Sequence, residues 1–232
     1  MRTLRNRAVL VWSLLSRRAI AAYQRRIRLN PYCSWSGSGR PWNTALDRGY
    51  GGWFPVPNLS GGYHGILRQW WEHYGLGNLA LLVSENTRVG SVFANRYPET
   101  QFVTTDYFPE LTSPHQDGTG GCDVIWNLYE EPPAQLQPHS FNSIVCQATV
   151  EHLHDPVGVL RRLAGLQSSG GRLYLHSHTP GFEYHGFPND YLRYWPEWFR
   201  DMPLSIPSYS LDELLCLGGH AFAVYQRRVG AS

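Results

Sequence analysis

The sequence is poor in the residues that build several common kinds of site. It contains no lysine, so arginine supplies all 20 of its Lys and Arg residues. Its four cysteines are scattered, at Cys33, Cys122, Cys146 and Cys216, and none belongs to a C-x-x-C pair. This spacing argues against a zinc ribbon and against a dense disulfide framework. We therefore expect reduced thiols in an intracellular protein.

Long apolar runs and a strong net charge are also absent. No uninterrupted apolar stretch approaches the ~20 residues that a membrane-spanning helix needs, and Arg17-Arg18 interrupts the one candidate. The formal net charge is only +2 over 232 residues, so no overall basic field indicates nucleic acid as a partner. A chain of this length buries a sizeable core as one domain, or as one domain with an extension.

Acidic residues are missing from about the first 46 positions, where arginines are frequent. These include Arg2, Arg5, Arg7, Arg17, Arg18, Arg25, Arg26 and Arg28. Apolar runs at 8–15 and 19–23 between them predict a basic amphipathic helix. Three interpretations remain open: the helix packs on the domain or on a second copy, it lies on a membrane surface, or it is an organellar transit segment.

Residues 31–62 interleave Gly, Ser and Pro with Trp and Phe. This composition predicts an ordered loop, which either caps a site or is pinned to the surface by its aromatic side chains. We therefore divide the chain into a helical and aromatic segment, 1–62, and an α/β domain, 63–232.

The clearest secondary-structure signal lies between residues 140 and 178. A short apolar strand is expected at 144–148. Asp155-Pro156 then opens a helix, because Asp can cap it and Pro suits its first turn. Leucines at 160, 163 and 166 give this helix an apolar stripe, a Ser-Ser-Gly-Gly run ends it, and a second strand is expected at 173–176. Two such strands joined by a helix form a right-handed crossover in a parallel sheet.

The rest of the chain alternates in the same way, which predicts an open, doubly wound α/β sheet. Further strands are expected at 79–83, 101–105, 122–126 and 221–225, and helices at 63–74, 89–97, 190–199 and 211–217.

The stretch FNSIVCQATVEHLHDPVGVLRRLAGLQSSGGRLYL resembles the second half of a class I S-adenosylmethionine (SAM) dependent methyltransferase domain. Members show a Phe-Asp-x-Val strand, a Glu-His-Leu/Val-x-Asp-Pro turn, a Leu-rich helix, Pro-Gly-Gly and a further strand. Here Asn142 takes the place of the Asp, residues 151–156 read EHLHDP, and residues 169–171 read SGG. The loop YHGFPNDYLRYWP at 184–196 is similar to one in a subset of the family. The resemblance implies a mostly parallel, seven-stranded Rossmann-like sheet, with SAM as the cofactor.

Ligands of open α/β sheets bind beyond the carboxyl ends of the strands, near the switch in strand order. We expect cofactor contacts from the residues at those ends: Ser84, Glu85, Asp106, Asn127, Cys146 and Gln147. Asp106 is the best single candidate, because an acid at the end of the second strand can accept both ribose hydroxyls, and the resemblance assigns it that role. The alternative is a solvated turn aspartate. Asn127 stands where relatives often carry Asp, and its amide can pair with an adenine edge.

The loop after the first strand departs from the family pattern. Members place an acid and a Gly-x-Gly-x-Gly-like turn there, since glycine lets the backbone pass close to the nucleoside and methionine groups. This chain reads LLVSENTRVGS, with Leu81 near the position of the acid and Gly90 as the only glycine. Glu85 can substitute for the acid from the loop. Either the loop follows another path to the cofactor, or the site is altered or no longer binds SAM.

Methyl transfer needs alignment and desolvation, and an oxygen or nitrogen acceptor can also use a histidine as base. We predict His178 and His185 as the catalytic residues, because the loop after the fifth strand faces the site. His176 and His178 share strand parity and so can point the same way.

The loop at 184–193 offers hydrogen-bonding groups to a substrate. We predict contacts from Tyr184, Asn189, Asp190 and Tyr191. The alternative is a loop that satisfies its own polar groups through Asp190 and Arg193.

No metal site is predicted. Some quinone-biosynthesis O-methyltransferases hold a divalent ion with a Glu-x-x-Glu-His cluster. The same register here reads ATVEH at 148–152, which lacks the first carboxylate.

The sequence as a whole predicts methyl transfer from SAM to an oxygen or nitrogen of a small polar or glycan-like acceptor. The expected compartment is the cytoplasm, or an organelle if the Arg-rich terminus is a transit segment. The first alternative is a non-catalytic binding or scaffold subunit with the methyltransferase fold. A second is an enzyme of this fold with another reaction.

Overall fold

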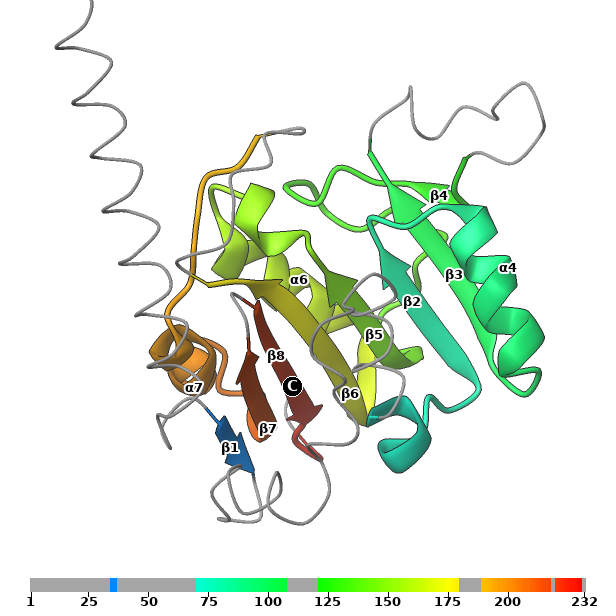
Figure 1. Cartoon of the computed structure of the whole chain (residues 1–232). Helices are drawn as coiled ribbons and strands as arrows, with labels where there is room; N and C mark the ends of the chain where they lie inside the picture. Colours follow the sequence, from blue (N-terminus) through cyan, green and yellow to red (C-terminus); the bar gives the residue numbers. More distant parts are fainter. Residues whose placement is uncertain (1–33, 37–69, 108–120, 180–188, 218–219, 231–232) are drawn as a thin grey trace, which may run out of the picture.

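Eight strands form a single sheet in the order β1-β7-β8-β6-β5-β2-β3-β4 (Figure 1). The structure is a computed structural model and describes residues 34–36, 70–107, 121–179, 189–217 and 220–230. The strands are β1 (Ser34–Ser36), β2 (Leu79–Val83), β3 (Gln101–Asp106), β4 (Val124–Ile125), β5 (Phe141–Gln147), β6 (Gln167–His178), β7 (Tyr209–Leu217) and β8 (His220–Arg227). The helices are α4 (Thr87–Arg96), the 3-10 turn η4 (Val150–His152), α6 (Pro156–Leu166) and α7 (Pro196–Ser205).

The sheet is parallel from β6 through β5, β2 and β3 to β4, and it is antiparallel at the end that holds β8, β7 and β1. The pairs β2–β3, β3–β4, β2–β5 and β5–β6 are parallel. The pairs β6–β8, β7–β8 and β1–β7 are antiparallel. This is the predicted doubly wound sheet of seven strands, β2 to β8, with β1 added at one edge. Residues 34–36, which the sequence assigned to the N-terminal segment, therefore join the sheet of the α/β domain.

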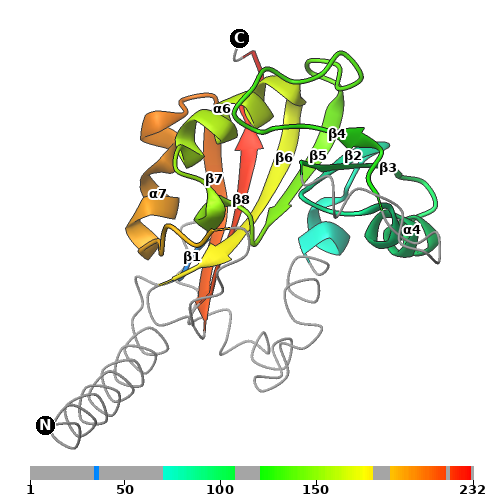
Figure 2. The same ribbon diagram turned by 90° about the horizontal axis from the view of Figure 1, so that it is seen from above.

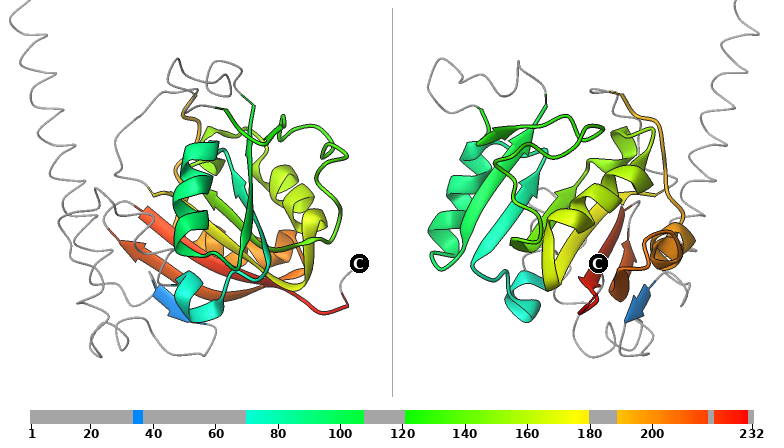
Figure 3. Two further views of the ribbon diagram at one scale, coloured as in Figure 1. Left: turned by 90° about the vertical axis from the view of Figure 1, so that its right-hand side faces the viewer. Right: turned by 180° about the vertical axis from the view of Figure 1, so that it is seen from behind.

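Helices cover both faces of the sheet (Figure 2). On one face α6 and α7 lie over a large apolar cluster that contains Leu160, Leu163 and Phe199. On the other face α4 and the helical residues 70–74 lie over a second cluster, which includes Trp71 and Phe93. The views in Figure 3 show α4 and α6 on opposite sides of the strands. The central strands β2, β5 and β6 are consequently buried on both faces over most of their length, as is usual for parallel strands.

The crossover between β5 and β6 forms as the sequence predicts. The Asp155 carboxylate caps α6 by accepting a hydrogen bond from Gly158 N at 3.0 Å, and Pro156 occupies the first turn. Leu160 and Leu163 are fully buried against the sheet. The helix ends at Leu166, and β6 follows directly.

Three expected elements differ from the structure. The predicted helix at 211–217 is wrong, because these residues lie in β7, where pairing with β8 satisfies the backbone. The predicted helix at 190–199 begins only at Pro196, since the preceding residues are extended and hydrogen-bond to Glu151 and His178. The Ser-Ser-Gly-Gly run does not separate α6 from a strand at 173. Instead β6 begins at Gln167, and its glycines fall at an irregular register against β5.

The N-terminal predictions lie largely outside the described residues. These are the basic helix with its membrane-surface or self-association role, and most of the aromatic cap. Among the helices of the described part, none is long and apolar enough to cross a membrane.

Candidate functional site

A cavity of about 430 Å³ opens at the carboxyl ends of the parallel strands. The strand order reverses there, because β3 lies on one side of β2 and the later strand β5 on the other. Such a switch point is where open α/β sheets bind ligands. The lining comes from the ends of β2, β3, β4 and β5 and from the η4 turn: Ser84, Thr105, Asp106, Tyr107, Trp126, Asn127, Leu128, Tyr129, Ala148, Thr149, His152, Leu153, His154, Asn189 and Tyr191.

Left-handed backbone conformations turn the chain at both sides of the switch. Ser84, directly after β2, has φ 57°, and Ala148, directly after β5, has φ 46°. Such angles suit glycine and cost other residues roughly 1–2 kcal/mol. Asn86 then caps α4 by accepting a hydrogen bond from Val89 N at 3.0 Å. The β2–α4 turn is therefore tight although it contains no glycine.

Glu85 points away from the cavity and toward the end of β5. Its Oε1 accepts a hydrogen bond from Gln147 Nε2 at 2.6 Å, and it is not among the lining residues. Burial raises the pKa of Glu85 to about 7, and the charge of Asp106 contributes in the same direction, although the Gln147 hydrogen bond opposes it. This carboxyl group therefore gains and loses its proton near neutral pH.

Asp106 ends β3 at the edge of the cavity. Its Oδ1 accepts a hydrogen bond from Tyr107 N at 2.7 Å, and its carbonyl accepts one from Trp126 N at 2.9 Å. The backbone on both sides of the carboxylate is thus fixed. The side chain is half-buried, so a ligand in the cavity can reach it.

The loop after β4 forms one wall of the cavity. Asn127 holds this loop in shape, because its Nδ2 donates to Glu130 Oε1 at 3.0 Å and its Oδ1 accepts from Tyr129 N at 3.2 Å. Trp126 and Leu128 add apolar surface. Asn127 lines the cavity, but both ends of its side-chain amide form hydrogen bonds within the loop.

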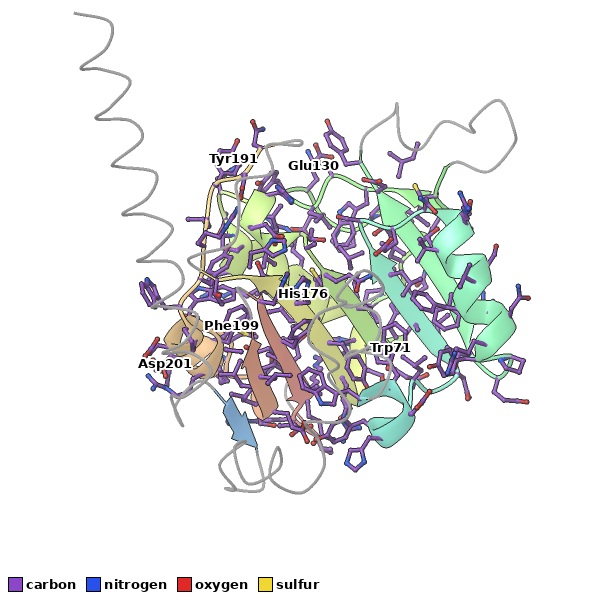
Figure 4. All side chains as sticks on the ribbon, viewed as in Figure 1. Trp71, Glu130, His176, Tyr191, Phe199 and Asp201 are labelled. Carbon is purple, nitrogen blue, oxygen red and sulfur yellow. The ribbon has the colours of Figure 1, made fainter. Side chains whose placement is uncertain are left out.

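Aromatic and imidazole rings form the rim of the cavity next to this wall. Tyr129 stacks on His154 with ring centroids 4.1 Å apart, and Tyr191 meets the same imidazole edge-on at 6.5 Å. His152 Nδ1 lies 2.5 Å from the carbonyl oxygen of Asn189. Tyr191 is 53% exposed at the mouth of the cavity. Figure 4 shows it on the same edge of the molecule as Glu130. This rim presents flat apolar faces together with hydrogen-bonding groups.

A buried polar cluster lies behind the rim. Glu151 Oε1 is 2.6 Å from His178 Nδ1, and Glu151 Oε2 accepts a hydrogen bond from Ser177 Oγ at 2.7 Å. Burial alone would raise the pKa of Glu151, but the hydrogen bonds and charge of His178 outweigh it and hold the pKa below its usual range. The carbonyl of Glu151 also accepts hydrogen bonds from the backbone of Tyr191 and Leu192. The cluster thereby fixes the rim against the end of β6.

Two further histidines adjoin this cluster. His176 Nε2 lies 3.1 Å from His220 Nδ1. Burial, followed by the charge of His178, lowers the pKa of His220 to about 3.

The structure brings five of the predicted residues to the cavity: Ser84, Asp106, Asn127, Asn189 and Tyr191. Gln147 and Glu85 lie behind the lining and contact each other. Cys146 is fully buried in the core, and burial raises the pKa of its thiol to about 12. His178 is buried beside Glu151 rather than in the lining. Asp190 forms an ion pair with Arg193. This pair is the alternative given above, in which the polar groups of the loop contact each other.

Tyr184 and His185 lie outside the described residues, and their roles stay predictions. Sequence reasoning did not select Tyr129, His152 or His154 as site residues. The EHLHDP turn was visible, but only the placement of η4 above the strand ends reveals that both histidines face the cavity.

Comparison with known proteins supports the fold and, weakly, the chemistry. No protein-family model matches the chain. A curated relative, the ubiquinone biosynthesis O-methyltransferase of Xanthomonas euvesicatoria, is 32% identical over 78 residues. The match covers 32% of this chain and about a third, 33%, of that protein.

Solved structures share the fold at low identity. A SAM-dependent methyltransferase from Archaeoglobus fulgidus matches with a TM-score of 0.54 and 10% identity, over 70% of this chain and 91% of its own. The [4+2]-cyclase SpnF matches with a TM-score of 0.50 and 9% identity, over 66% of this chain and 76% of its own. At such identities the likeness concerns the fold alone, and function depends on the site.

Proposed function

We propose that this chain, which has the class I SAM-dependent methyltransferase fold, transfers a methyl group from SAM to an oxygen or nitrogen of a small acceptor. The observation that carries the proposal is the Asp106 carboxylate, which ends β3 beside a cavity at the switch in strand order. The curated relative is named an O-methyltransferase, which favours oxygen as the acceptor atom.

The residues present fit the nucleoside half of SAM. The cavity volume of about 430 Å³ lies within the range of roughly 300–1,000 Å³ typical of small-molecule sites. Asp106 would accept hydrogen bonds from the ribose hydroxyls, as acids at this position of a nucleotide-binding sheet do. Trp126, Leu128 and Leu153 supply apolar walls for the purine ring.

The methionine half would be held at the β2–α4 turn. The left-handed backbone at Ser84 makes the turn that glycine makes in relatives, and Glu85 is drawn back toward Gln147. Only the small Ser84 side chain therefore projects into the cavity from this turn. The carboxylates of Glu85 and Asp106 place negative charge near a ligand that carries a positive sulfonium and a positive amino group.

When bound, SAM supplies an electrophilic methyl group, and the protein has to align and desolvate the acceptor. His152 would act as the base. Its Nδ1 lies 2.5 Å from the Asn189 carbonyl oxygen and its Nε2 lies 4.0 Å from Glu151 Oε1. The ring also lines the cavity, so it is the imidazole placed to receive a proton from the acceptor. His178, one of the two catalytic residues predicted from the sequence, would act instead through Glu151 by holding η4 in position.

The acceptor would pack against the rim formed by Tyr129, His154 and Tyr191. Aromatic rings of this kind pack against a planar ring or against the flat face of a sugar, and Asn189 adds a polar contact. A small polar or glycan-like acceptor remains our proposal, with phenolic compounds as the other group to test.

A non-catalytic binding subunit is the alternative, and the absence of glycine from Ser84-Glu85-Asn86 is the feature that favours it. Calorimetry with SAM and its demethylated product S-adenosylhomocysteine separates the two functions. We expect Asp106→Asn to weaken binding at least tenfold, since hydrogen bonds to a charged group contribute about 1.5–3 kcal/mol.

Asp201→Asn is the matched control, because Asp201 is an exposed acid on α7 that does not line the cavity and lies apart from Tyr191 at its mouth (Figure 4). It should bind SAM as the wild type does. If neither SAM nor its product binds the wild-type protein, the methyltransferase proposal fails. If SAM binds, transfer of labelled methyl to phenols, sugars and amines identifies the acceptor class, and His152→Ala should lower kcat.

A further inference from the structure

Three histidines from two neighbouring strands meet on one face of the sheet. His176 and His178 are two residues apart on β6, and β8 places His220 directly opposite His178. Residues two apart on a strand, and residues opposite each other in an antiparallel pair, share a face. The three side chains are buried, with exposed fractions of 0%, 2% and 3%. Figure 4 shows His176 within the sheet, away from the edge where Tyr191 lies.

We propose that His176, His178 and His220 form a binding site for a divalent first-row transition-metal ion, with Zn²⁺ as the best match. One nitrogen from each imidazole lies within 4.8 Å of the other two. Zn–N bonds of about 2.0–2.1 Å in tetrahedral geometry place neighbouring nitrogens roughly 3.3 Å apart. The distance between His176 Nε2 and His220 Nδ1, 3.1 Å, is already close to this value.

The choice of ion follows from the ligand type. Neutral imidazole suits Zn²⁺, Cu²⁺, Co²⁺ and Ni²⁺, whereas Mg²⁺ and Ca²⁺ take oxygen ligands. Among the described residues, this is the one group of three metal-ligating side chains with such close nitrogen atoms. The Glu-x-x-Glu-His register considered in the sequence analysis would use residues 148–152, so the site proposed here is a different one.

The surroundings hold the three rings in place, as the outer shell of a metal site does. Glu151 Oε1 lies 2.6 Å from His178 Nδ1, so this histidine would offer its Nε2 to the ion. Ser177 Oγ in turn donates to the other oxygen of Glu151. Phe222 stacks on His176 with ring centroids 4.6 Å apart. A carboxylate that orients a ligating histidine is a recurring feature of zinc sites.

The ion would have a positioning role. It would join β6 to β8 and, through Glu151, fix the η4 turn whose His152 lines the cavity. Three protein ligands leave a fourth position for water. The alternative is a metal-free cluster in which His176 and His220 simply share a hydrogen bond. The proposal does not depend on methyl transfer.

Cobalt provides the most direct test. The full-length protein is treated with a chelator, dialysed and titrated with Co²⁺, which gives visible d–d absorption when three nitrogens and a water surround it. We expect the absorption to saturate at one equivalent of Co²⁺ and to be displaced by Zn²⁺. No saturable band in the wild-type protein would overturn the proposal.

Variants locate the ion. His176→Ala and His220→Ala should abolish the band, whereas His73→Ala, which removes an exposed histidine outside the cluster, should keep it. A band that survives both cluster variants would place the ion elsewhere and refute the site. If one of the two cluster variants does not fold, the other locates the ion.

Thermal unfolding gives a second readout. Zn²⁺ at about 100 times its Kd should raise the Tm of the wild type by roughly 5–10 °C, and that of His220→Ala hardly at all. An equal rise in both proteins would indicate nonspecific binding and contradict the proposal.

Discussion

The affinity for SAM should depend on pH through Glu85, and replacing this residue by glutamine should remove the dependence. Burial raises the pKa of Glu85 to about 7, and the neighbouring charge of Asp106 adds to the effect. A cation that binds near these two acids favours the ionised form of Glu85. Ionisation and SAM binding are therefore linked, and each promotes the other.

The magnitude follows from the ionised fraction. With a pKa of about 7, roughly a tenth of the free protein carries the Glu85 charge at pH 6 and roughly nine tenths at pH 8. If the bound cation returns the pKa toward its ordinary value near 4.5, the affinity should rise about tenfold between these pH values, which is ~1.4 kcal/mol. S-adenosylhomocysteine lacks the sulfonium charge and should show a smaller rise.

Calorimetry at pH 6, 7 and 8 measures the effect. Glu85→Gln has nearly the same shape but no charge to gain, so its affinity for SAM should vary little over this range. A wild-type affinity that is constant from pH 6 to 8, or a glutamine variant with the same slope as the wild type, would refute the linkage.

A stability measurement checks the raised pKa without SAM. When the pKa of a carboxyl group is higher in the folded than in the unfolded state, its protonated form favours folding. This contribution to stability is fully present at pH values below the unfolded-state pKa. That contribution is lost as pH rises through about 7. At pH 8 the charged form costs at most about 3 kcal/mol, so Glu85→Gln should unfold at a higher temperature than the wild type there, and the difference should shrink toward pH 5.

Three other substitutions test contacts around the site and the crossover. Asp155→Ala removes the acceptor for Gly158 N, and we expect urea denaturation to show a loss of about 1 kcal/mol. Gly90→Ala would place a methyl group 2.9 Å from Thr104 Cγ2, where α4 packs on β3; the Tm should fall, with a cost of about 1–3 kcal/mol. Glu151→Gln removes a buried charge with a lowered pKa, so it should cost about 1–3 kcal/mol at pH 7. That loss should disappear as pH falls through the folded-state pKa, because the wild-type carboxylate is then protonated as well.

The regular parts of the fold could be predicted because their signals are local. The apolar runs at 79–83 and 144–148 predicted β2 and most of β5, and the Asp-Pro pair predicted the start of α6, without knowledge of the tertiary structure. The run LDELLCL at 211–217 led to the wrong prediction of a helix, since its leucine spacing also fits a helix. Pairing with β8 decided its conformation, and that contact is not visible in the local sequence.

The sequence could indicate which residues lie at the edge of the sheet where the site forms, but not in which direction their side chains point. Strand ends meet at one edge of a parallel sheet, so Asp106 and Ser84 could be assigned to it. Whether a side chain at a strand end faces the cavity or the core depends on register and on the following turn. For that reason Cys146 lies in the core, and Gln147 hydrogen-bonds to Glu85. The η4 turn places His152 over the strand ends, and no pattern in the sequence predicts this path of the backbone.

The absence of glycine from the β2–α4 turn argues less strongly against SAM binding once the structure is considered than it does from the sequence alone. A glycine-rich turn matters because of the backbone path that it permits, and Ser84 and Ala148 follow left-handed paths at the two sides of the switch point without being glycine. Both positions line the cavity, so the strain lies at the ligand-facing edge, where functional sites commonly hold such conformations. The Glu85 carboxyl group, whose pKa is raised by burial to about 7, stands behind this turn. In its ionised form it would attract the positive sulfonium and amino groups of SAM, and this attraction supports the proposed methyl donor over a scaffold role.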